Sequence, residues 1–461
     1  MAEKLTNEQQ AAVDSRERSL LVSAAAGSGK TKVLVERLFS YVEREGANLD
    51  DFLIITYTRA AASELRGKIA KALTERMERD PGNYHLRQQM LRVYRADIKT
   101  VDAFCTALLR ENCHLLGEDA RGHALRPDFR VLDENEAQVL RERVLARTLD
   151  DFYDCLTPGG TLLADTLGAG RDDSALEDLV LELHAKLQAQ PYEDKWLEAQ
   201  RAFWRAVPDK IEDTPYGKIL LNEVRRKARH CKNLLQRAAQ EMCANDALNQ
   251  KYAPAFLDAS YQLEALEGKT AEGWDAARGV TIAFPRLAAV KDSDGGEMKA
   301  RMKSLWDNCK ETVKGFAEIF SASSDEAVED LRTMASAMLA LIDLTADFSR
   351  RYNEEKRRRN SADFSDQEHE AIRLLIGEDG APTELARIVS ARYREIMVDE
   401  YQDTNEVQNR IFDAISCKGE NLFTVGDVKQ SIYRFRLADP RIFLQHYNTW
   451  PPLEDAEEHD S

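Results

Sequence analysis

An acidic pair placed directly after an apolar segment, near the C-terminal end of this 461-residue chain, restricts the possible folds most strongly. Ile396-Met397-Val398 has the composition of a buried strand, and Asp399-Glu400 follows it. Nucleotide hydrolases hold Mg²⁺ and activate water with acidic side chains at such strand ends. Near the N-terminus, the apolar segment 20–22 precedes the segment 24–31, which is typical of a phosphate-binding loop. The fold must therefore bring the two ends of the chain together in one domain.

Apolar segments that alternate with amphipathic ones predict a parallel β-sheet. Strand patterns occupy residues 20–23, 52–56, 98–101, 396–398 and 422–425. Helical patterns stand between them, at residues 31–42, 60–73, 102–111 and 407–415. This βαβ alternation is typical of a parallel sheet whose strands are buried on both faces. We therefore expect an α/β fold.

The middle of the chain has a different pattern, because long charged stretches with helical periodicity fill it from about residue 130 to 358. Few loops interrupt it, and we expect two of them at 158–160 and 294–296. The simplest interpretation is one parallel-sheet domain interrupted by a large, mostly helical insertion. We place the parts of that organisation at 1–115 (first part of the sheet domain), 116–359 (insertion), 360–450 (second part of the sheet domain) and 451–461 (disordered acidic end).

Composition sets limits on location and partners. No segment approaches the roughly 20 apolar residues of a membrane span, and the N-terminus lacks the apolar core of a signal peptide. We expect a cytoplasmic protein with no membrane partner. The net charge of −17 argues against a protein that coats DNA by charge alone, although a groove that grips a few nucleotides needs only local positive charge and stacking surfaces. The seven cysteines form no Cys-x-x-Cys pair, so neither a zinc site nor a redox motif is indicated.

The phosphate-binding loop predicts a specific division of roles. Gly27 and Gly29 allow the tight backbone path, Lys30 reaches the β- and γ-phosphates, and Thr31 supplies a hydroxyl to Mg²⁺. The usual first glycine of such a loop is Ala24 in this chain. The structural alternative is a Gly-Ser loop that precedes a helix, which the preceding strand and the N-terminal location make improbable.

The acidic pair predicts the catalytic half of the same site. Asp399 would hold Mg²⁺, and Glu400 would orient and deprotonate the attacking water. An isolated Asp-Glu dipeptide is common on solvated loops, so the prediction depends on the strand that precedes it.

The segment 425–436 is the third constellation, since a strand pattern ends at Gly426-Asp427 and aromatic residues then alternate with arginines. Gln430 is a candidate sensor of the γ-phosphate. Tyr433 and Phe435 are candidates for stacking on bases, each worth roughly 1–3 kcal/mol. The alternative, that both aromatic residues belong to the core, has equal weight when the segment is considered alone.

Together these segments resemble the UvrD/Rep superfamily of DNA helicases, and within it most of all the N-terminal part of the AddA subunits of bacterial AddAB helicase–nucleases. Residues 5–13 resemble the adenine-reading segment, which places Gln9 on the base. Residues 398–405 resemble motif II, and 425–436 resemble motif III, in which Gln430 couples the ATP state to DNA. Residues 437–440 have the AddA form of that segment, and 128–133 and 363–366 also resemble AddA. The nucleotide-binding residues that the resemblance implies are Gln9, Ala24, Ala25, Ala26, Gly27, Ser28, Gly29, Lys30 and Thr31.

The resemblance also implies a set of DNA contacts. Residues 55–62 resemble motif Ia, where an aromatic side chain meets single-stranded DNA. Motif Ib usually reads Thr-x-His-Ser-Phe, and here Asp102 replaces the histidine, which makes that position a doubtful phosphate contact. The DNA-binding residues that we expect are Tyr57, Thr58, Thr100, Phe104, Tyr433, Phe435 and Arg436.

For the whole chain, the resemblance implies a RecA-like motor subdomain 1A split by a helical subdomain 1B, ATP and Mg²⁺ as cofactors, and single-stranded DNA and duplex ends as substrates. It further implies an AddB-like partner subunit, double-strand break repair and 3′→5′ movement. Members of the family continue into motifs IV to VI, with arginine fingers, and AddA then adds a nuclease domain. Since this sequence stops at Ser461, soon after motif III, two hypotheses stay open: a helicase motor, or an ATP- and DNA-binding module with little turnover of its own. A P-loop protein unrelated to DNA is a weaker third.

Overall fold

The computed structural model describes residues 5–16, 18–25, 27–119, 121–167, 174–416, 420–431 and 438–453, and for 292–295 the backbone only. The chain divides into two compact units. Unit 1 comprises Met1–Cys155, Gly170–Leu197 and Asp343–Ser461, and unit 2 comprises Leu156–Ala169 and Glu198–Ile342. Each unit is described by itself.

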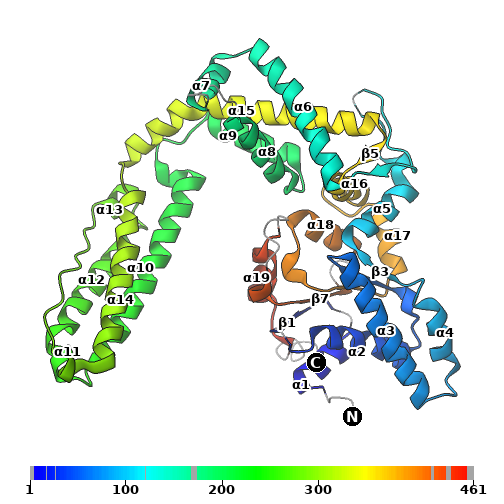
Figure 1. The fold of residues 1–461 in the computed structure, drawn as a ribbon, viewed down its shortest axis with the longest axis horizontal. Coiled ribbons are helices and arrows are strands. Elements are labelled where there is room, and N and C mark those ends of the chain that lie inside the picture. The colour runs from blue at the N-terminus through cyan, green and yellow to red at the C-terminus, as the bar shows by residue number, and fades with distance from the viewer. Residues whose placement is uncertain are drawn as a thin grey trace. The chain divides into compact units, whose positions relative to one another are not determined.

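Unit 1 contains a parallel β-sheet, which has five strands among the described residues (Figure 1). The strands are β1 (Leu20–Ser23), β2 (Phe52–Thr56), β3 (Asp97–Thr100), β6 (Glu395–Val398) and β7 (Leu422–Gly426). Their order is β1-β7-β6-β2-β3, and every neighbouring pair is parallel. The prediction of a parallel α/β sheet is confirmed. The strand that carries the phosphate-binding loop, β1, lies beside the last strand of the chain, so the two ends of the sequence do meet.

Helices cover both faces of the sheet because its strands are apolar on both sides. In β2, Phe52 and Ile54 belong to one hydrophobic core and Leu53 and Ile55 to another, as alternation along a strand requires. The first core includes residues of α1 (Asn7–Asp14), α2 (Lys30–Glu45), α3 (Arg59–Arg79) and α4 (Tyr84–Arg92). The second includes residues of α5 (Val101–Asn112), α16 (Phe364–Leu375), α17 (Glu384–Arg392), α18 (Glu406–Ile415) and α19 (Pro440–Thr449).

Part of the segment expected as an insertion packs with the sheet unit. Unit 1 includes α6 (Glu134–Asp154), α8 (Ser174–Gln188), the first residues of α9 (Glu193–Arg205) and the end of α15 (Ser324–Arg358). It also includes a small parallel pair, β4 (Arg130–Val131) and β5 (Ser361–Ala362). At the end of α15 the buried Lys356 ammonium lies 2.8 Å from the Asp363 carboxylate and 2.7 Å from that of Asp366. This ion-pair cluster attaches α15 to the start of α16.

Unit 2 is helical throughout its described residues (Figure 1). Its helices are α7 (Pro158–Leu167), α10 (Pro215–Met242), α11 (Asp246–Lys251), α12 (Ala253–Lys269), α13 (Trp274–Arg278), α14 (Asp292–Ile319) and the first part of α15. The helices α10, α12 and α14 enclose an apolar core, in which the rings of Phe256 and Trp306 stack with centroids 4.8 Å apart. None of the helices that the structure describes is long and apolar enough to cross a membrane.

Two segments predicted as loops are wrong. Residues 158–160 form the first turn of α7, where the Thr157 hydroxyl accepts from the Gly160 amide at 3.1 Å. Gly159 packs so closely that a Cβ there would collide with the carbonyl of Ser336, and packing rather than a turn explains this glycine. Residues 294–296 lie within α14, although Gly296 has φ 49°, which kinks the helix. The predicted disordered end at 451–461 falls mostly outside the described residues.

Candidate nucleotide site

The phosphate-binding loop connects β1 to the N-terminus of α2. Gly27 and Gly29 have φ of 75° and 82°, which is left-handed backbone that side chains with a Cβ rarely adopt. Ser28 closes the loop on itself, since its amide and its hydroxyl both donate to the Ala25 carbonyl, at 3.1 and 2.6 Å. The Ala24 amide donates to the Gly426 carbonyl at 3.0 Å, which attaches the loop to β7. The loop therefore presents the N-terminus of a 16-residue helix, a ready site for an anion.

Gln9 lies beside this loop, as the adenine-reading hypothesis requires. It sits in α1, where Thr6 and Gln9 form a capping box. Its side-chain amide donates to the Ser28 carbonyl at 2.8 Å and approaches Gly29 closely. Gln9 thus contacts the loop that would hold the phosphates.

Asp399 and Glu400 follow β6 at the same edge of the sheet. The Asp399 amide donates to the Ile55 carbonyl at 3.0 Å, which continues the ladder between β6 and β2. Glu400 then adopts φ 55°, a left-handed conformation that is rare for a residue with a side chain and costs free energy. The surrounding structure must compensate for that strain. It does so partly through Gln402, which is 1% exposed and donates to the Glu400 carboxylate at 2.7 Å.

Lys30, Glu400 and Gln430 meet although they are far apart in the sequence. The Lys30 ammonium donates to the Gln430 amide oxygen at 3.2 Å and lies 3.9 Å from the Glu400 carboxylate. The Gln430 side-chain amide donates to Asp427 at 2.6 Å. These contacts join the phosphate-binding loop, the end of β6 and the end of β7.

Two cavities open at this edge of the sheet. One of about 580 Å³ lies against the loop and includes Lys30, Thr31, Lys68, Glu400 and Gln430 in its lining. The other, of about 390 Å³, shares those last three residues and Thr31, and also includes Asp399, Tyr57 and Thr58. The predicted phosphate, metal and motif Ia residues therefore surround adjoining space.

The electrostatics of Asp399 suit a metal ligand that awaits its cation. Burial, and then the nearby Glu400 carboxylate, raise the pKa of Asp399 to about 6. The positive charges of Lys30 and Lys68 only partly offset this. A carboxylate in such surroundings is stabilised by a cation placed next to it.

The donor set fits Mg²⁺ bound together with a nucleotide. Within the described residues no group of three or more His, Cys, Asp or Glu side chains is placed to hold a metal alone. Mg²⁺ usually takes one or two protein oxygens together with substrate phosphates and water, and Thr31 and Asp399 offer such oxygens beside one cavity. Bound Mg²⁺ would neutralise phosphate charge.

The residues predicted to contact DNA lie in different settings. Tyr57 is partly buried, and its hydroxyl shares a 2.5 Å hydrogen bond with the Thr404 hydroxyl. Thr58 caps α3 by accepting from the Ala61 amide at 3.0 Å. Thr100 caps α5 by accepting from the Ala103 amide at 3.2 Å. Both threonines have their hydroxyls engaged with the backbone, so any contact to phosphate would be an additional one.

Phe104 has the least accessible side chain of this set. It is 5% exposed and belongs to the core formed by α5, α16 and α18. In this conformation its ring serves packing. The predicted site residues Ala26, Tyr433, Phe435 and Arg436 lie outside the described residues.

Three residues of the site were not among those predicted. Gln402 and Asp427 stand inside the segments that resemble motifs II and III, and the Asp427 amide donates to the Gln402 amide oxygen at 2.9 Å. A polar residue that stays polar within a buried strand-end segment was the available signal. Lys68 lies on α3 and lines both cavities. Its sequence context is that of any solvated helix face, so no pattern singles it out.

Comparison with known proteins gives a consistent result. The family described as "UvrD/REP helicase N-terminal domain" matches residues 5–451. A protein of Ruminiclostridium cellulolyticum, whose name describes one subunit of an ATP-dependent helicase/nuclease, is 34% identical over 98% of this chain. Proteins of the same name from Acetivibrio thermocellus and Desulfitobacterium hafniense (strain DCB-2) are 35% and 38% identical over 97% and 98% of it. The chain spans only 34–37% of the length of these three relatives.

Proposed function

Since this chain belongs to the UvrD/REP helicase family, we propose that it forms the ATP-binding motor portion of a DNA helicase. In this proposal Lys30 and the loop hold the phosphates, Gln9 reads the adenine, and Thr31 and Asp399 hold Mg²⁺. Glu400 orients and deprotonates water, and Gln430 reports the state of the γ-phosphate. The observation that carries the proposal is the meeting of Lys30, Glu400 and Gln430 at one edge of the sheet.

The wider assignment follows from the family and from the names of the relatives. We propose movement in the 3′→5′ direction on single-stranded DNA, from duplex ends, in a helicase–nuclease complex for double-strand break repair. The relatives' names describe one component of a multi-component enzyme, and they support an AddB-like protein as the partner. We propose the cytoplasm as the location. Residues 1–115 and 360–450 would correspond to subdomain 1A, and 116–359 to subdomain 1B.

A second candidate function is an ATP- and DNA-binding module with little hydrolysis of its own. Among the described residues that line the two cavities, the cationic side chains are lysines: Lys30, Lys32 and Lys68. Phosphoryl-transfer motors commonly add an arginine finger, which is worth about 10³–10⁵ in rate. The chain would then bind ATP and wait for an arginine from elsewhere.

One experiment separates the two candidates. ATP–Mg²⁺ binding and hydrolysis by the purified 461-residue chain are measured with and without single-stranded DNA. Tight binding with slow hydrolysis that DNA barely stimulates supports the binding module. Fast, DNA-stimulated hydrolysis supports the self-sufficient motor. A chain that binds neither ATP nor DNA contradicts both candidates.

A further inference from the structure

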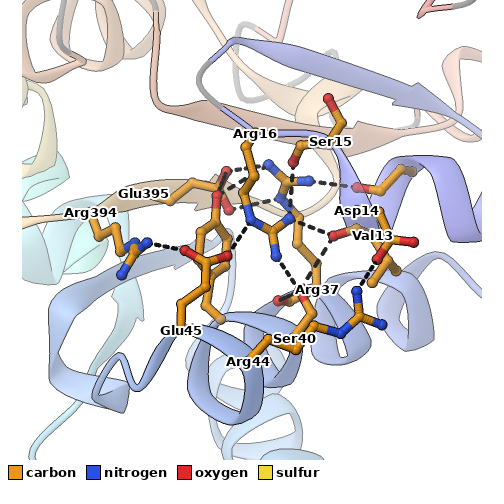
Figure 2. Close-up of polar contacts among 12 residues, drawn as sticks. Val13, Asp14, Ser15, Arg16, Arg37, Ser40, Arg44, Glu45, Arg394 and Glu395 are labelled. Atoms are coloured by element: carbon orange, nitrogen blue, oxygen red, sulfur yellow. Dashed lines mark hydrogen bonds and ion pairs between the residues drawn. The ribbon is translucent and has the colours of Figure 1, made fainter.

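One buried arginine contacts every element that carries a nucleotide-site residue. Arg37 is 0% exposed and lies on α2, about two turns after Lys30. Its guanidinium donates to both oxygens of the Glu395 carboxylate, at 2.5 and 2.8 Å (Figure 2). Glu395 is the first residue of β6, the strand that leads into Asp399. A single ion pair thus joins the phosphate-binding helix to the metal-binding strand.

The same guanidinium reaches two further elements. It donates to the carbonyl of Ala12 at 2.6 Å, in the helix that carries Gln9. It also lies over the ring of Phe423, 4.6 Å from the centroid, in the strand that leads to Asp427 and Gln430. Arg37 therefore touches α1, α2, β6 and β7 together.

Stability alone does not explain a charged pair at this position. Removing two charges from water is costly, and well-packed apolar side chains often stabilise such a site equally well or better. Burial by itself would lower the pKa of Arg37, but the hydrogen bonds and charge of Glu395 outweigh burial and raise it. The guanidinium stays charged, and its fixed fork geometry specifies direction as well as contact.

Arg16 forms a second attachment between α1 and α2, closer to the surface. Its side chain is 22% exposed. It donates to the Val13 carbonyl at 2.7 Å and to the Ser40 hydroxyl at 2.6 Å, and its Nε lies 2.7 Å from Glu45 (Figure 2). The C-terminal end of α1 is thus fixed to α2 at two points, by Arg37 and by Arg16.

We propose that Arg37 is a positioning residue of the nucleotide site, which holds the adenine-reading helix α1 in register with the phosphate-binding helix α2. Arg16 supports it. The inference rests on the proposed function, because it assigns the adenine to Gln9 and the phosphates to the loop. It adds that the two recognition elements act together only while the arginines join them.

The test compares two ligands, Mg²⁺–ATP and Mg²⁺–tripolyphosphate, which differ by the nucleoside. Arg37→Lys keeps a cation beside Glu395 but cannot fork to Ala12 as well. Arg16→Gln removes the outer attachment from a partly exposed position, where folding is least at risk. Dissociation constants are measured calorimetrically on the full chain, at temperatures well below the unfolding of each variant.

We expect ATP affinity to fall about tenfold in Arg37→Lys, and less in Arg16→Gln, while tripolyphosphate affinity stays within about twofold. Lys356→Arg is the matched control, because Lys356 is also a buried cation held by two carboxylates in unit 1. It should lower the melting temperature and leave the ratio of the two affinities unchanged. A purely structural role for Arg37 predicts the same unchanged ratio.

The outcomes separate the inference from the proposed function. A wild-type chain that fails to bind ATP overturns the proposed function. Wild-type binding with an unaltered ratio in Arg37→Lys and Arg16→Gln overturns the inference alone. If Arg37→Lys does not fold, the ratio in Arg16→Gln decides.

Discussion

The Gln402 side chain bridges two strand ends: its amide donates to the Glu400 carboxylate at 2.7 Å, and its oxygen accepts the Asp427 amide at 2.9 Å. Gln402 also fills the space against Gly426, where a Cβ would collide with the glutamine. The side chain that faces water activation and the strand that leads to Gln430 are therefore held by one buried residue.

Replacing this bridge should affect hydrolysis more than binding. In Gln402→Ala, Glu400 loses its orienting donor, and single-turnover hydrolysis should fall about 10²-fold while ATP affinity stays near wild type. The buried Asp427 amide also loses its acceptor, which costs about 1–3 kcal/mol of stability. Gln89→Ala is the control, because Gln89 is equally buried and accepts from the Leu49 amide at 2.9 Å. A similar loss of hydrolysis in both variants would contradict the assigned role.

Lys30 and Glu400 should separate binding from chemistry. Lys30→Ala removes the cation that would face the phosphates, and nucleotide binding should be lost. Glu400→Gln keeps the shape and removes the base, so binding should persist while hydrolysis stops in the full-length enzyme. Fluorescent-nucleotide binding and phosphate release measure the two effects. Equal loss of binding in the two variants would show that the roles are misassigned.

Asp399 should make stability and Mg²⁺ binding depend on pH. Its folded pKa of about 6 is above its ordinary 3.8, so its contribution to stability is fully present below pH 3.8 and is lost as the pH rises through about 6. Mg²⁺ binds the ionised carboxylate, so its stabilisation of the ATP complex should appear over that same rise. Melting temperatures from pH 4 to 8 should show this in wild type, with and without Mg²⁺–ATP.

Asp399→Asn is the necessary control for that series. Burial also raises the pKa values of Asp366 and Glu368 to about 7, and these groups titrate in an overlapping range. The difference between wild type and Asp399→Asn isolates Asp399. A difference that does not change with pH would refute the metal-ligand assignment.

Tyr57 should affect DNA binding through its ring rather than its hydroxyl. Burial raises the pKa of that hydroxyl well above its ordinary value, so it stays protonated beside Thr404. Tyr57→Phe should lower stability by about 1 kcal/mol and retain single-strand affinity. Tyr57→Ala should weaken that affinity by about 1–3 kcal/mol. Fluorescence anisotropy with a labelled oligonucleotide checks both.

Tyr393 supplies the matched control, because its hydroxyl donates to Asp97 at 2.5 Å at the opposite edge of the sheet. Tyr393→Phe should cost similar stability, and neither Tyr393→Phe nor Tyr393→Ala should change DNA affinity. If Tyr57→Ala weakens DNA binding no more than Tyr393→Ala does, stacking by Tyr57 is excluded.

The parts of the fold that were predictable had a periodic signal. The segments 20–23 and 52–56 were predicted with the bounds of β1 and β2, because buried strands between helices leave continuous apolar runs. The two-residue strands β4 and β5 have no room for a period. The turn at Gly159 failed for another reason, since its glycine is required by contact with Ser336, which is remote in sequence.

The candidate site was predictable where motif and geometry coincide. The proximity of Lys30 to Glu400 follows from a parallel sheet with both strand ends at one edge. The engagement of Tyr57 with Thr404, and the burial of Phe104, depend on how α5, α16 and α18 pack, and one sequence does not reveal that. Arg37 was invisible for the same reason: in the sequence it is one more arginine of an amphipathic helix.

The pairing of β1 with β7 also affects how the protein is made. Leu20 pairs with Phe423, so about 400 residues must leave the ribosome before β1 gains its neighbour. At about 5–20 residues per second, that interval lasts roughly 20–80 s. During that time β1 lacks its neighbour β7, and β2 lacks β6 on one side. The nascent chain therefore carries open strand edges for most of its synthesis, which makes it a natural client for chaperones that shield such edges.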